Sequence, residues 1–311
     1  NSEDKNLSTP IALDTLKLMR TRLNNGGTHF IIEVTSEGID QCRVLGINFN
    51  IKILTNITQD HLDYHKTFEN YKNIKLSFMK EGENYKIFPK DFENEPIYFS
   101  SLLLGDFNLL NIKAATRALR HMSVKEVYIN KTLSTCKSPS GRLEEVNHGQ
   151  KYMVIIDYAH TPDAIENILN TVKKISLERE GNLYVMFGCG GDRDRTKRPI
   201  MGKLAASIAD FVIVTDDNPR SESSLNIINE ILEGFPADFK KYRVIQNRKK
   251  AIEFSINKAK NKDIIVFLGK GHEKYQVLKT KTINFDEKII AKKAIIIKLK
   301  KISSENDFLV N

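Results

Sequence analysis

From residue 151 onward, continuous apolar runs alternate with amphipathic segments. The apolar runs cover 152–159, 182–188, 211–217 and 263–269. The amphipathic segments cover 162–175, 199–209, 225–235 and 249–260, and a further one, rich in lysine, covers 286–302. Apolar strands separated by amphipathic helices are typical of a parallel, doubly wound sheet. We therefore predict one Rossmann-like α/β domain in this part of the chain.

The first part of the chain is also α/β, but its pattern is less regular. We predict helices at 13–23, 68–79 and 108–122, strands at 29–34 and 51–57, and two further β-runs at 84–89 and 96–105. The loop 136–142 is rich in Ser, Pro and Gly, which favours a domain boundary there. The expected domains are therefore 1–138 and 139–311.

Composition narrows the class of protein. The 311 residues are 41% hydrophobic and 28% charged, with three cysteines and no Trp, which fits a globular protein of the reduced cytoplasm rather than a disulfide scaffold. No apolar run is long enough to predict membrane insertion. The net charge is +9, but the lysines are dispersed and no aromatic–basic platform accompanies them, so we expect no nucleic-acid partner.

Polar side chains follow the predicted strand 29–34. Glu33 ends that strand, and Thr35 and Ser36 come directly after it. A carboxylate beside hydroxyls suits a hard cation such as Mg²⁺. The other interpretation, favoured by this segment alone, is a helix N-cap formed by Thr35 or Ser36.

A second group follows the predicted strand 51–57, where two Asp and two His fall between residues 60 and 65. Such residues ligate metals or transfer protons, but they are also common in polar turns. Lys75 lies on the next predicted helix. It either extends along the surface or directs an ammonium, or a modified lysine, into a cleft.

Further motifs point to a nucleotide and a zwitterion. Asn108 and Asn111 share one helix face and have the donors and acceptors that an adenine edge requires, although capping explains one of them. Asp157 and His160 follow a strand of the predicted sheet, ahead of a helix capped by Thr161.

Beyond the later strands stand Arg193 and Arg220, whose guanidinium groups can grip a carboxylate. Asn218 and Pro219 form a rigid turn, and Glu273 in GKGHE can receive an ammonium. Ligands bind at this edge of open α/β sheets, so we predict a pocket for a zwitterion.

Taken in order, these segments resemble the Mur ligases of peptidoglycan synthesis. The matching motifs are STP at 8–10, EVTSEGIDQCR at 33–43, TNITQDHLDYH at 55–65, YKNIK at 71–75, LLGDFNLLN at 103–111, SGRLE at 140–144, DYAHTPDA at 157–164, GCGGDRDRTKRP at 188–199, DNPR at 217–220 and GKGHE at 269–273. The resemblance implies a central ATPase domain followed by the Rossmann-like C-terminal domain. Within the family, this chain most resembles the branch that adds the third amino acid to UDP-N-acetylmuramoyl-L-alanyl-D-glutamate through an acyl phosphate.

The resemblance also implies residue roles, with ATP and Mg²⁺ as cofactors. The UDP-muramoyl dipeptide would contact Ser8, Thr9, Thr35, Gln41 and Arg43. ATP would contact Asn108, Asn111, Arg142 and Asp157, and Mg²⁺ would bind Glu33, His61 and Lys75, where the family carries a carbamylated lysine. Lys75 and His61 would thus serve catalysis. The incoming amino acid would contact Arg193, Asp217, Asn218, Pro219, Arg220, Gly269 and Glu273.

The DNPR form is similar to that of enzymes that select meso-2,6-diaminopimelate, because an arginine suits the distal carboxylate that lysine lacks. Two departures stand out. Glu37 follows Thr35-Ser36 where the family usually has His, and the family's glycine-rich phosphate loop is not found in this sequence. We therefore expect a monomeric fragment with negligible ligase activity of its own. The alternatives are a lysine-adding ligase, a folylpolyglutamate synthase relative, or a non-catalytic binding remnant.

Overall fold

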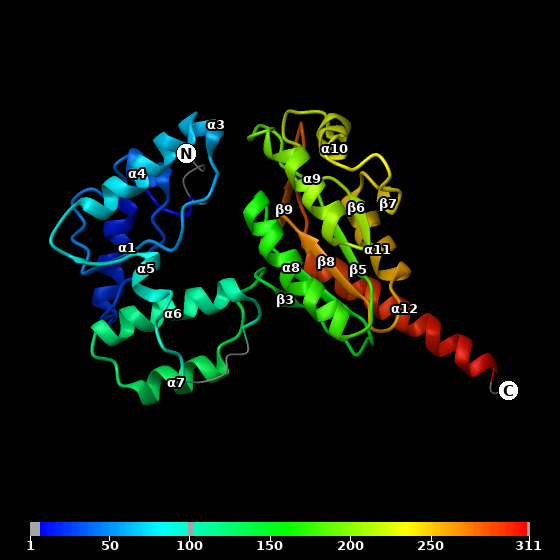
Figure 1. The fold of residues 1–311 in the computed structure, drawn as a ribbon, viewed down its shortest axis with the longest axis horizontal. Coiled ribbons are helices and arrows are strands. Elements are labelled where there is room, and N and C mark those ends of the chain that lie inside the picture. The colour runs from blue at the N-terminus through cyan, green and yellow to red at the C-terminus, as the bar shows by residue number, and fades with distance from the viewer. Residues whose placement is uncertain (1–6, 99–102, 310–311) are drawn as a thin grey trace. The chain divides into compact units, whose positions relative to one another are not determined.

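The computed structural model describes residues 7–98 and 103–309 (Figure 1). The chain forms two compact units. The first contains Asn1–Ile97 and Asn111–Glu126, and the second contains Tyr98–Leu110 and Val127–Asn311. Helix α6 (Asp106–His121) contributes residues to both units. The predicted boundary between residues 138 and 139 stays a prediction.

The second unit is built on a six-stranded sheet of order β3-β4-β8-β5-β6-β7. Its strands are β3 (Glu144–Glu145), β4 (Met153–Asp157), β5 (Leu183–Phe187), β6 (Phe211–Val214), β7 (Tyr242–Val244) and β8 (Ile264–Leu268). Strands β4 to β8 are mutually parallel, and only β3 pairs antiparallel, with β4. The predicted doubly wound α/β domain is confirmed. The short edge strands β3 and β7 were not predicted, because neither forms an apolar run.

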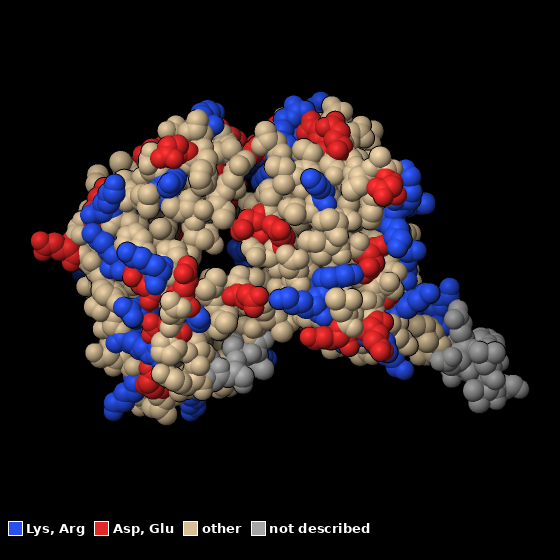
Figure 2. All heavy atoms as spheres, viewed as in Figure 1, with Lys and Arg blue, Asp and Glu red and all other residues tan. Residues whose placement is uncertain are grey.

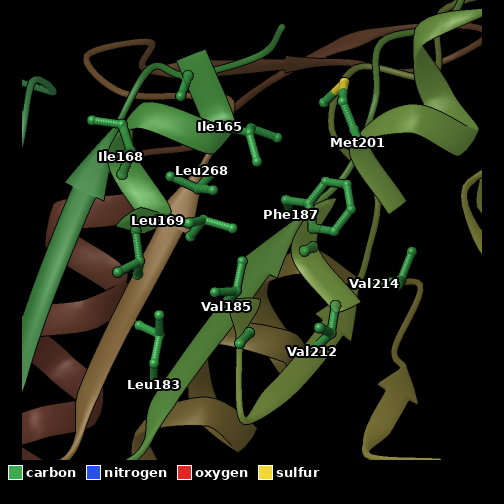
Figure 3. Close-up of a cluster of buried hydrophobic side chains, with 14 of the residues drawn as sticks. Ile165, Ile168, Leu169, Leu183, Val185, Phe187, Met201, Val212, Val214 and Leu268 are labelled. Atoms are coloured by element: carbon green, nitrogen blue, oxygen red, sulfur yellow. The ribbon is translucent and has the colours of Figure 1, made fainter. Parts of the chain in front are cut away.

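Helices cover both faces of this sheet (Figure 1). They are α8 (Pro162–Glu178), α9 (Lys197–Ile208), α10 (Ser224–Leu232), α11 (Arg248–Lys258) and α12 (Glu287–Leu309). Side chains of α8, α9 and α10 form one core with the sheet, and those of α11 and α12 form the other. Figure 3 shows Ile165 and Leu169 of α8 beside Val185 and Phe187 of β5. Both faces of the central strands are therefore buried, which explains their continuous apolar sequences.

Local signals set where these helices begin. Thr161 is the N-cap of α8, where its Oγ1 accepts a hydrogen bond from the Ala164 N–H at 3.3 Å, and Pro162 occupies the first turn. The predicted capping role of Thr161 is confirmed. Helix α7 (Glu126–Thr135), apart from its first residue, also belongs to the second unit. A hairpin of β9 (Tyr275–Val277) with β10 (Thr282–Asn284) completes that unit.

The first unit is mainly helical. Its elements are α1 (Ala12–Asn24), α2 (Ser36–Asp40), β1 (Ile51–Ile53), α3 (Leu62–His65), α4 (Phe68–Lys80), β2 (Tyr85–Ile87) and α5 (Pro89–Phe92). Strands β1 and β2 pair in parallel, with Ile51 opposite Tyr85. A small core of Ile87, Phe92 and Ala114 lies beside them.

The strand predicted at 29–34 is wrong. These residues form no strand, and Ile31 is 97% exposed. The physical reason is that no described strand hydrogen-bonds to this segment, and an extended segment becomes a strand only through such pairing. Of the β-run predicted at 96–105, residues 99–102 lie outside the described residues, and the described residues on either side form no strand.

Surface charges are mixed in sign. On the face shown in Figure 2, Lys and Arg side chains are interspersed with Asp and Glu. Within the described part of the chain, no helix combines the length and the apolar character needed to cross a bilayer.

Candidate active site

The loops that follow the parallel strands of the second unit hold most of the predicted functional residues. Residues 188–193 follow β5, residues 215–223 follow β6, and residues 269–273 follow β8. The first two loops are joined by a hydrogen bond of 2.9 Å from the Gly191 N–H to the Asn218 carbonyl oxygen. These segments therefore lie together at the carboxyl edge of the sheet, where open α/β sheets bind ligands.

A buried arginine holds two of these loops. Arg198 at the start of α9 is fully buried and donates to Glu222 at 2.7 and 2.9 Å and to Glu230 at 2.6 Å. It also donates to the carbonyl oxygen of Gly190 at 3.0 Å. Gly190 lies on the loop after β5 and Glu222 on the loop after β6, so the hydrogen bonds of Arg198 connect these two loops. The two carboxylates also compensate the buried charge of Arg198.

The two predicted carboxylate clamps flank one glycine. A Cβ placed on Gly190 would lie 2.9 Å from Arg220 Nη1 and 3.6 Å from Arg193 Cγ. Arg220 has a left-handed backbone, with φ of 50°, and its Nη1 donates to the Gly191 carbonyl oxygen at 2.8 Å. Arg193 is exposed, whereas Pro219 is buried. Arg193, on the loop after β5, and Arg220, on the loop after β6, therefore both lie close to Gly190.

Three of the residues predicted to contact the incoming amino acid form a compact polar cluster around Lys270. Its Nζ lies 3.2 Å from Asp217 Oδ1, 2.9 Å from Asn218 Oδ1 and 2.9 Å from Glu273 Oε2. Asn218 Nδ2 in turn donates to Glu273 Oε2 at 3.1 Å. Asp217, Asn218 and Lys270 are all buried, and Glu273 is partly exposed.

Glycine is required at position 269 for two reasons. Its φ of +108° belongs to a region that residues with a side chain rarely adopt. A Cβ there would also lie 2.8 Å from Asp217 Oδ2. The backbone therefore approaches the Asp217 carboxylate more closely than any other residue type would allow.

Two predicted ATP residues, Arg142 and Asp157, lie near the end of β4. The Asp157 carboxylate is buried and accepts hydrogen bonds from the Leu143 and Ala159 N–H groups, each at 2.7 Å. Burial raises the pKa of Asp157, while these two hydrogen bonds oppose the rise. The Arg142 guanidinium is exposed and stacks over the Tyr158 ring at 5.0 Å. Asp157 thus orders the loop that presents Arg142.

His160 lies in the same neighbourhood. Its ring packs against Tyr158 with centroids 4.8 Å apart, and the centroid of the His272 ring lies 5.2 Å from that of Tyr158. The other two predicted ATP residues are on α6, where Asn108 Nδ2 donates to the Leu104 carbonyl oxygen at 2.8 Å and Asn111 is exposed.

In the first unit, Thr9 organises the segment around Glu33. The Thr9 hydroxyl is fully buried; it donates to the Glu33 carbonyl oxygen at 2.9 Å and accepts from the Thr35 N–H at 2.9 Å. Thr35 Oγ1 accepts from the Gly38 N–H at 3.1 Å and so caps α2. The capping alternative is therefore present for Thr35, and the exposed Ser8 lies just before this network.

Gln41 and Arg43 belong to an exposed polar chain beside it. Arg43 Nε donates to Gln41 Oε1 at 3.0 Å, and Arg43 Nη1 donates to the Thr9 carbonyl oxygen at 3.0 Å. Gln41 donates to the Tyr64 hydroxyl at 3.3 Å, which donates to Asp40 at 2.6 Å. These predicted substrate residues are already connected to one another.

His61 lies between two carboxylates. Its Nδ1 is 3.1 Å from Glu37 and its Nε2 is 3.5 Å from Asp60. The hydrogen bond to Glu37 is the main reason that the pKa of His61 is raised, against the effect of burial. Its φ of 55° is left-handed, which is uncommon for a residue with a side chain and recurs at functional sites. Glu37, at the position where the sequence departs from the family pattern, therefore contacts a predicted catalytic residue.

Lys75 on α4 is partly buried, with its Nζ 5.3 Å from the centroid of the Tyr71 ring. Burial lowers the pKa of Lys75, and the charges of Glu33 and Asp60 oppose this. The ammonium of Lys75 is therefore close enough to both carboxylates for their charges to act on it.

The chemistry of their donor atoms determines whether Glu33, His61 and Lys75 could hold Mg²⁺. Within the described residues, no three His, Cys, Asp or Glu side chains gather as a metal site. An ammonium at Lys75 would repel Mg²⁺, whereas a carbamate there would present two oxygens of the kind that Mg²⁺ prefers. Glu33, a deprotonated His61 and a carbamylated Lys75 would therefore fit the ion.

Sequence reasoning missed three residues of these sites. Lys270 stands inside the GKGHE motif and Arg198 inside GCGGDRDRTKRP, but neither was assigned a role. Arg248, at the start of α11, carries no motif and became visible only through its burial and its contacts.

Comparison with known proteins shows the family of this chain. Residues 1–94 match the family model "Mur ligase middle domain", and residues 141–271 match "Mur ligase, glutamate ligase domain". A protein of Clostridium botulinum named "UDP-N-acetylmuramoyl-L-alanyl-D-glutamate--2,6-diaminopimelate ligase" is 37% identical over 332 residues, covering 93% of this chain and 68% of the relative. A Clostridium tetani protein of the same name is 36% identical, with 93% and 67% covered.

A solved structure with that enzyme name is 28% identical, with a TM-score of 0.55, and covers 93% of this chain and 68% of its own. The fold is thus that of an ATP-dependent ligase that joins an acid to an amine. The chain belongs to the Mur ligase family, whose members serve peptidoglycan synthesis.

Proposed function

We propose that this chain carries the amino-acid site of a ligase that adds meso-2,6-diaminopimelate to UDP-N-acetylmuramoyl-L-alanyl-D-glutamate. The observation that carries the proposal is the gathering of two arginines and an Asp–Asn–Glu cluster on loops of one sheet edge. The names of the relatives support the same substrates.

The arrangement suits a molecule with a carboxylate and an ammonium at its far end. Arg220 and Arg193 would take the carboxylate, because a guanidinium binds it through two parallel hydrogen bonds. Asp217, Asn218 and Glu273, with Pro219 and Gly269 shaping the loops, would receive the ammonium. Lysine lacks the distal carboxylate, so it would leave the arginines unpaired and bind more weakly.

In the proposed reaction, the D-glutamyl carboxylate receives the terminal phosphoryl group of ATP, and the amine of diaminopimelate then displaces phosphate. Asn108, Asn111, Arg142 and Asp157 would contact ATP. Ser8, Thr9, Thr35, Gln41 and Arg43 would contact the UDP-muramoyl dipeptide. Positioning and charge neutralisation supply most of the rate in such transfers.

Glu33, His61 and Lys75 would hold Mg²⁺, which neutralises phosphate charge when bound. The lowered pKa of Lys75 supports its carbamylation, since only the neutral amine reacts with CO₂. We further propose that the chain acts as a monomer in the cytoplasm, in keeping with its dispersed charges and few cysteines.

Titration calorimetry of the purified chain with meso-diaminopimelate and with L-lysine tests the amino-acid site. We expect diaminopimelate to bind at least about a hundredfold more tightly, because the arginines would be unpaired with lysine. Arg220→Met should narrow that ratio, and Arg243→Met, on the exposed edge strand β7, should leave it unchanged. Tighter binding of lysine would favour the lysine-adding alternative, and absence of binding by both amino acids would contradict the proposal.

A further inference from the structure

Lys270 is a fully enclosed cation of the candidate amino-acid site. Its side chain is 0% exposed, and its Nζ meets three oxygen acceptors, on Asp217, Asn218 and Glu273, within 3.2 Å. An ammonium has three N–H donors, so all three can be satisfied here. Burying a charge is costly without such partners, which means that Lys270 and its neighbours depend on one another.

Lys270 and the Val277 N–H together determine which way the Asn218 carboxamide points. Asn218 Oδ1 accepts from Lys270 and also from the Val277 N–H at 2.9 Å, which are both donors only. The amide nitrogen is thereby left to face Glu273 Oε2, at 3.1 Å. Without the ammonium, the oxygen loses one of its two donors and the orientation of the amide is less strongly determined.

Lys270 also keeps two carboxylates in one small space. Asp217 and Glu273 each direct one oxygen to the ammonium. The other Asp217 oxygen lies beside Gly269, where the close backbone leaves no room for a side chain. Two carboxylates and one ammonium leave a single net negative charge, which matches one ligand ammonium.

We propose that Lys270 is a positioning residue of the amino-acid site, holding Asp217, Asn218 and Glu273 in the arrangement that receives the ammonium of the incoming amino acid. This inference rests on the proposed function, but it assigns Lys270 a role through its neighbours and no contact with the ligand. If Lys270 acted only through its charge, its removal would change the affinity for the ligand ammonium in one direction; if it acts by positioning its neighbours, the change would be in the opposite direction. A more negative site should attract an ammonium more strongly, whereas a disordered site should bind it less well.

The test compares Lys270→Met with the wild-type chain by two measurements. Nitrogen-15 NMR follows solvent exchange of the Asn218 side-chain amide without ligand, and calorimetry follows binding of meso-diaminopimelate. We expect faster amide exchange and an affinity loss of at least about tenfold, the usual scale for lost hydrogen bonds to a charged group. Lys298→Met is the matched control, because Lys298 is a half-buried lysine that donates to the Ile256 carbonyl oxygen, outside the site.

If Lys270→Met does not fold, Lys270→Gln repeats both measurements with a neutral side chain that still donates hydrogen bonds. A folded variant with unchanged amide exchange, or with equal or tighter binding, would overturn the positioning role. Failure of the wild-type chain to bind diaminopimelate would contradict the proposed function. If Lys270→Met still speeds exchange of the Asn218 amide, the positioning of Asn218 by Lys270 would be upheld independently of that function.

Discussion

Arg248 and Glu287 form an ion pair in which both side chains are fully buried, with Nε of the arginine 2.8 Å from Oε1 of the glutamate. The same guanidinium donates to the Asp216 carbonyl oxygen at 3.1 Å and to the Leu268 carbonyl oxygen at 2.8 Å. The Leu268 carbonyl lies at the end of β8, and the Asp216 carbonyl lies two residues beyond the end of β6. The ion pair therefore fixes the origins of two loops that carry the candidate amino-acid site.

Replacing one partner of this pair should destabilise the fold strongly. Glu287→Met leaves the Arg248 charge buried and uncompensated, so we expect the free energy of unfolding to fall by about 3–5 kcal/mol. Urea denaturation measures it. The double variant Arg248→Met/Glu287→Met should recover much of the loss, since apolar replacements of a buried pair are often tolerated.

Glu253→Met provides the control for that measurement. Glu253 belongs to an exposed pair with Lys249 at 3.9 Å, so its loss should cost no more than about 0.5 kcal/mol. If Glu287→Met and Glu253→Met lower the free energy of unfolding equally, the buried pair does not stabilise the second unit more than an exposed pair does.

Asp216 should make stability depend on pH. Burial raises the pKa of Asp216 to about 6, from an ordinary value of 3.8, with the hydrogen bond from Ser224 opposing the rise. The folded state then binds this proton more tightly than the unfolded chain. The contribution of Asp216 to the free energy of unfolding is therefore fully present below about pH 4, and it is lost as the pH rises through about 6.

Asp216→Asn should remove this loss, so that the variant gains stability relative to the wild type between about pH 4 and about pH 6. Urea denaturation at several pH values measures the difference. Asp238→Asn, which changes an exposed carboxylate on the same unit, should leave the pH dependence as it was. A constant difference between Asp216→Asn and the wild type over this range would refute the prediction.

Gly269→Ala should impair amino-acid binding as well as stability. Its positive φ costs about 1–3 kcal/mol for a residue with a side chain, and the added methyl group would press on Asp217 Oδ2. Gly149→Ala is the matched control, because Gly149 has φ of +88° but nothing within 4 Å of the added Cβ. Both variants should lose stability by thermal unfolding, and only Gly269→Ala should lose affinity for diaminopimelate in calorimetry.

Lys75 should form a carbamate. Its lowered pKa increases the neutral amine, whose nitrogen bonds to the carbon of CO₂ while a proton is released. Carbon-13 NMR in labelled bicarbonate should detect the carbamate in the wild type and not in Lys75→Arg. Lys52→Arg should keep the signal: burial lowers the pKa of Lys52 too, but its Nζ donates to the Phe78 and Glu81 carbonyl oxygens at 2.7 and 3.0 Å. A signal that survives in Lys75→Arg would assign the carbamate elsewhere.

Periodicity predicted the buried strands well because they are apolar on both faces. Strands β4, β5 and β8 each lie within one or two residues of the expected limits. The edge strand β7 escaped prediction, since all three of its residues are exposed and its sequence has no apolar run. The segment 29–34 failed in the opposite way: it is apolar enough for a strand but has no described partner.

The sequence by itself determined which chemical groups follow each strand, and so it led to Arg193, Arg220, Asp217, Asn218 and Glu273 and to the Mur ligase family. Those residues stand in local motifs that can be recognised in a linear chain. Only the tertiary structure decided that Lys270 lies among three of them, that Arg198 joins two loops and that Arg248 pairs with Glu287. The physical reason is that a charge becomes a positioning group through burial and through partners that are distant in sequence, which no local pattern records.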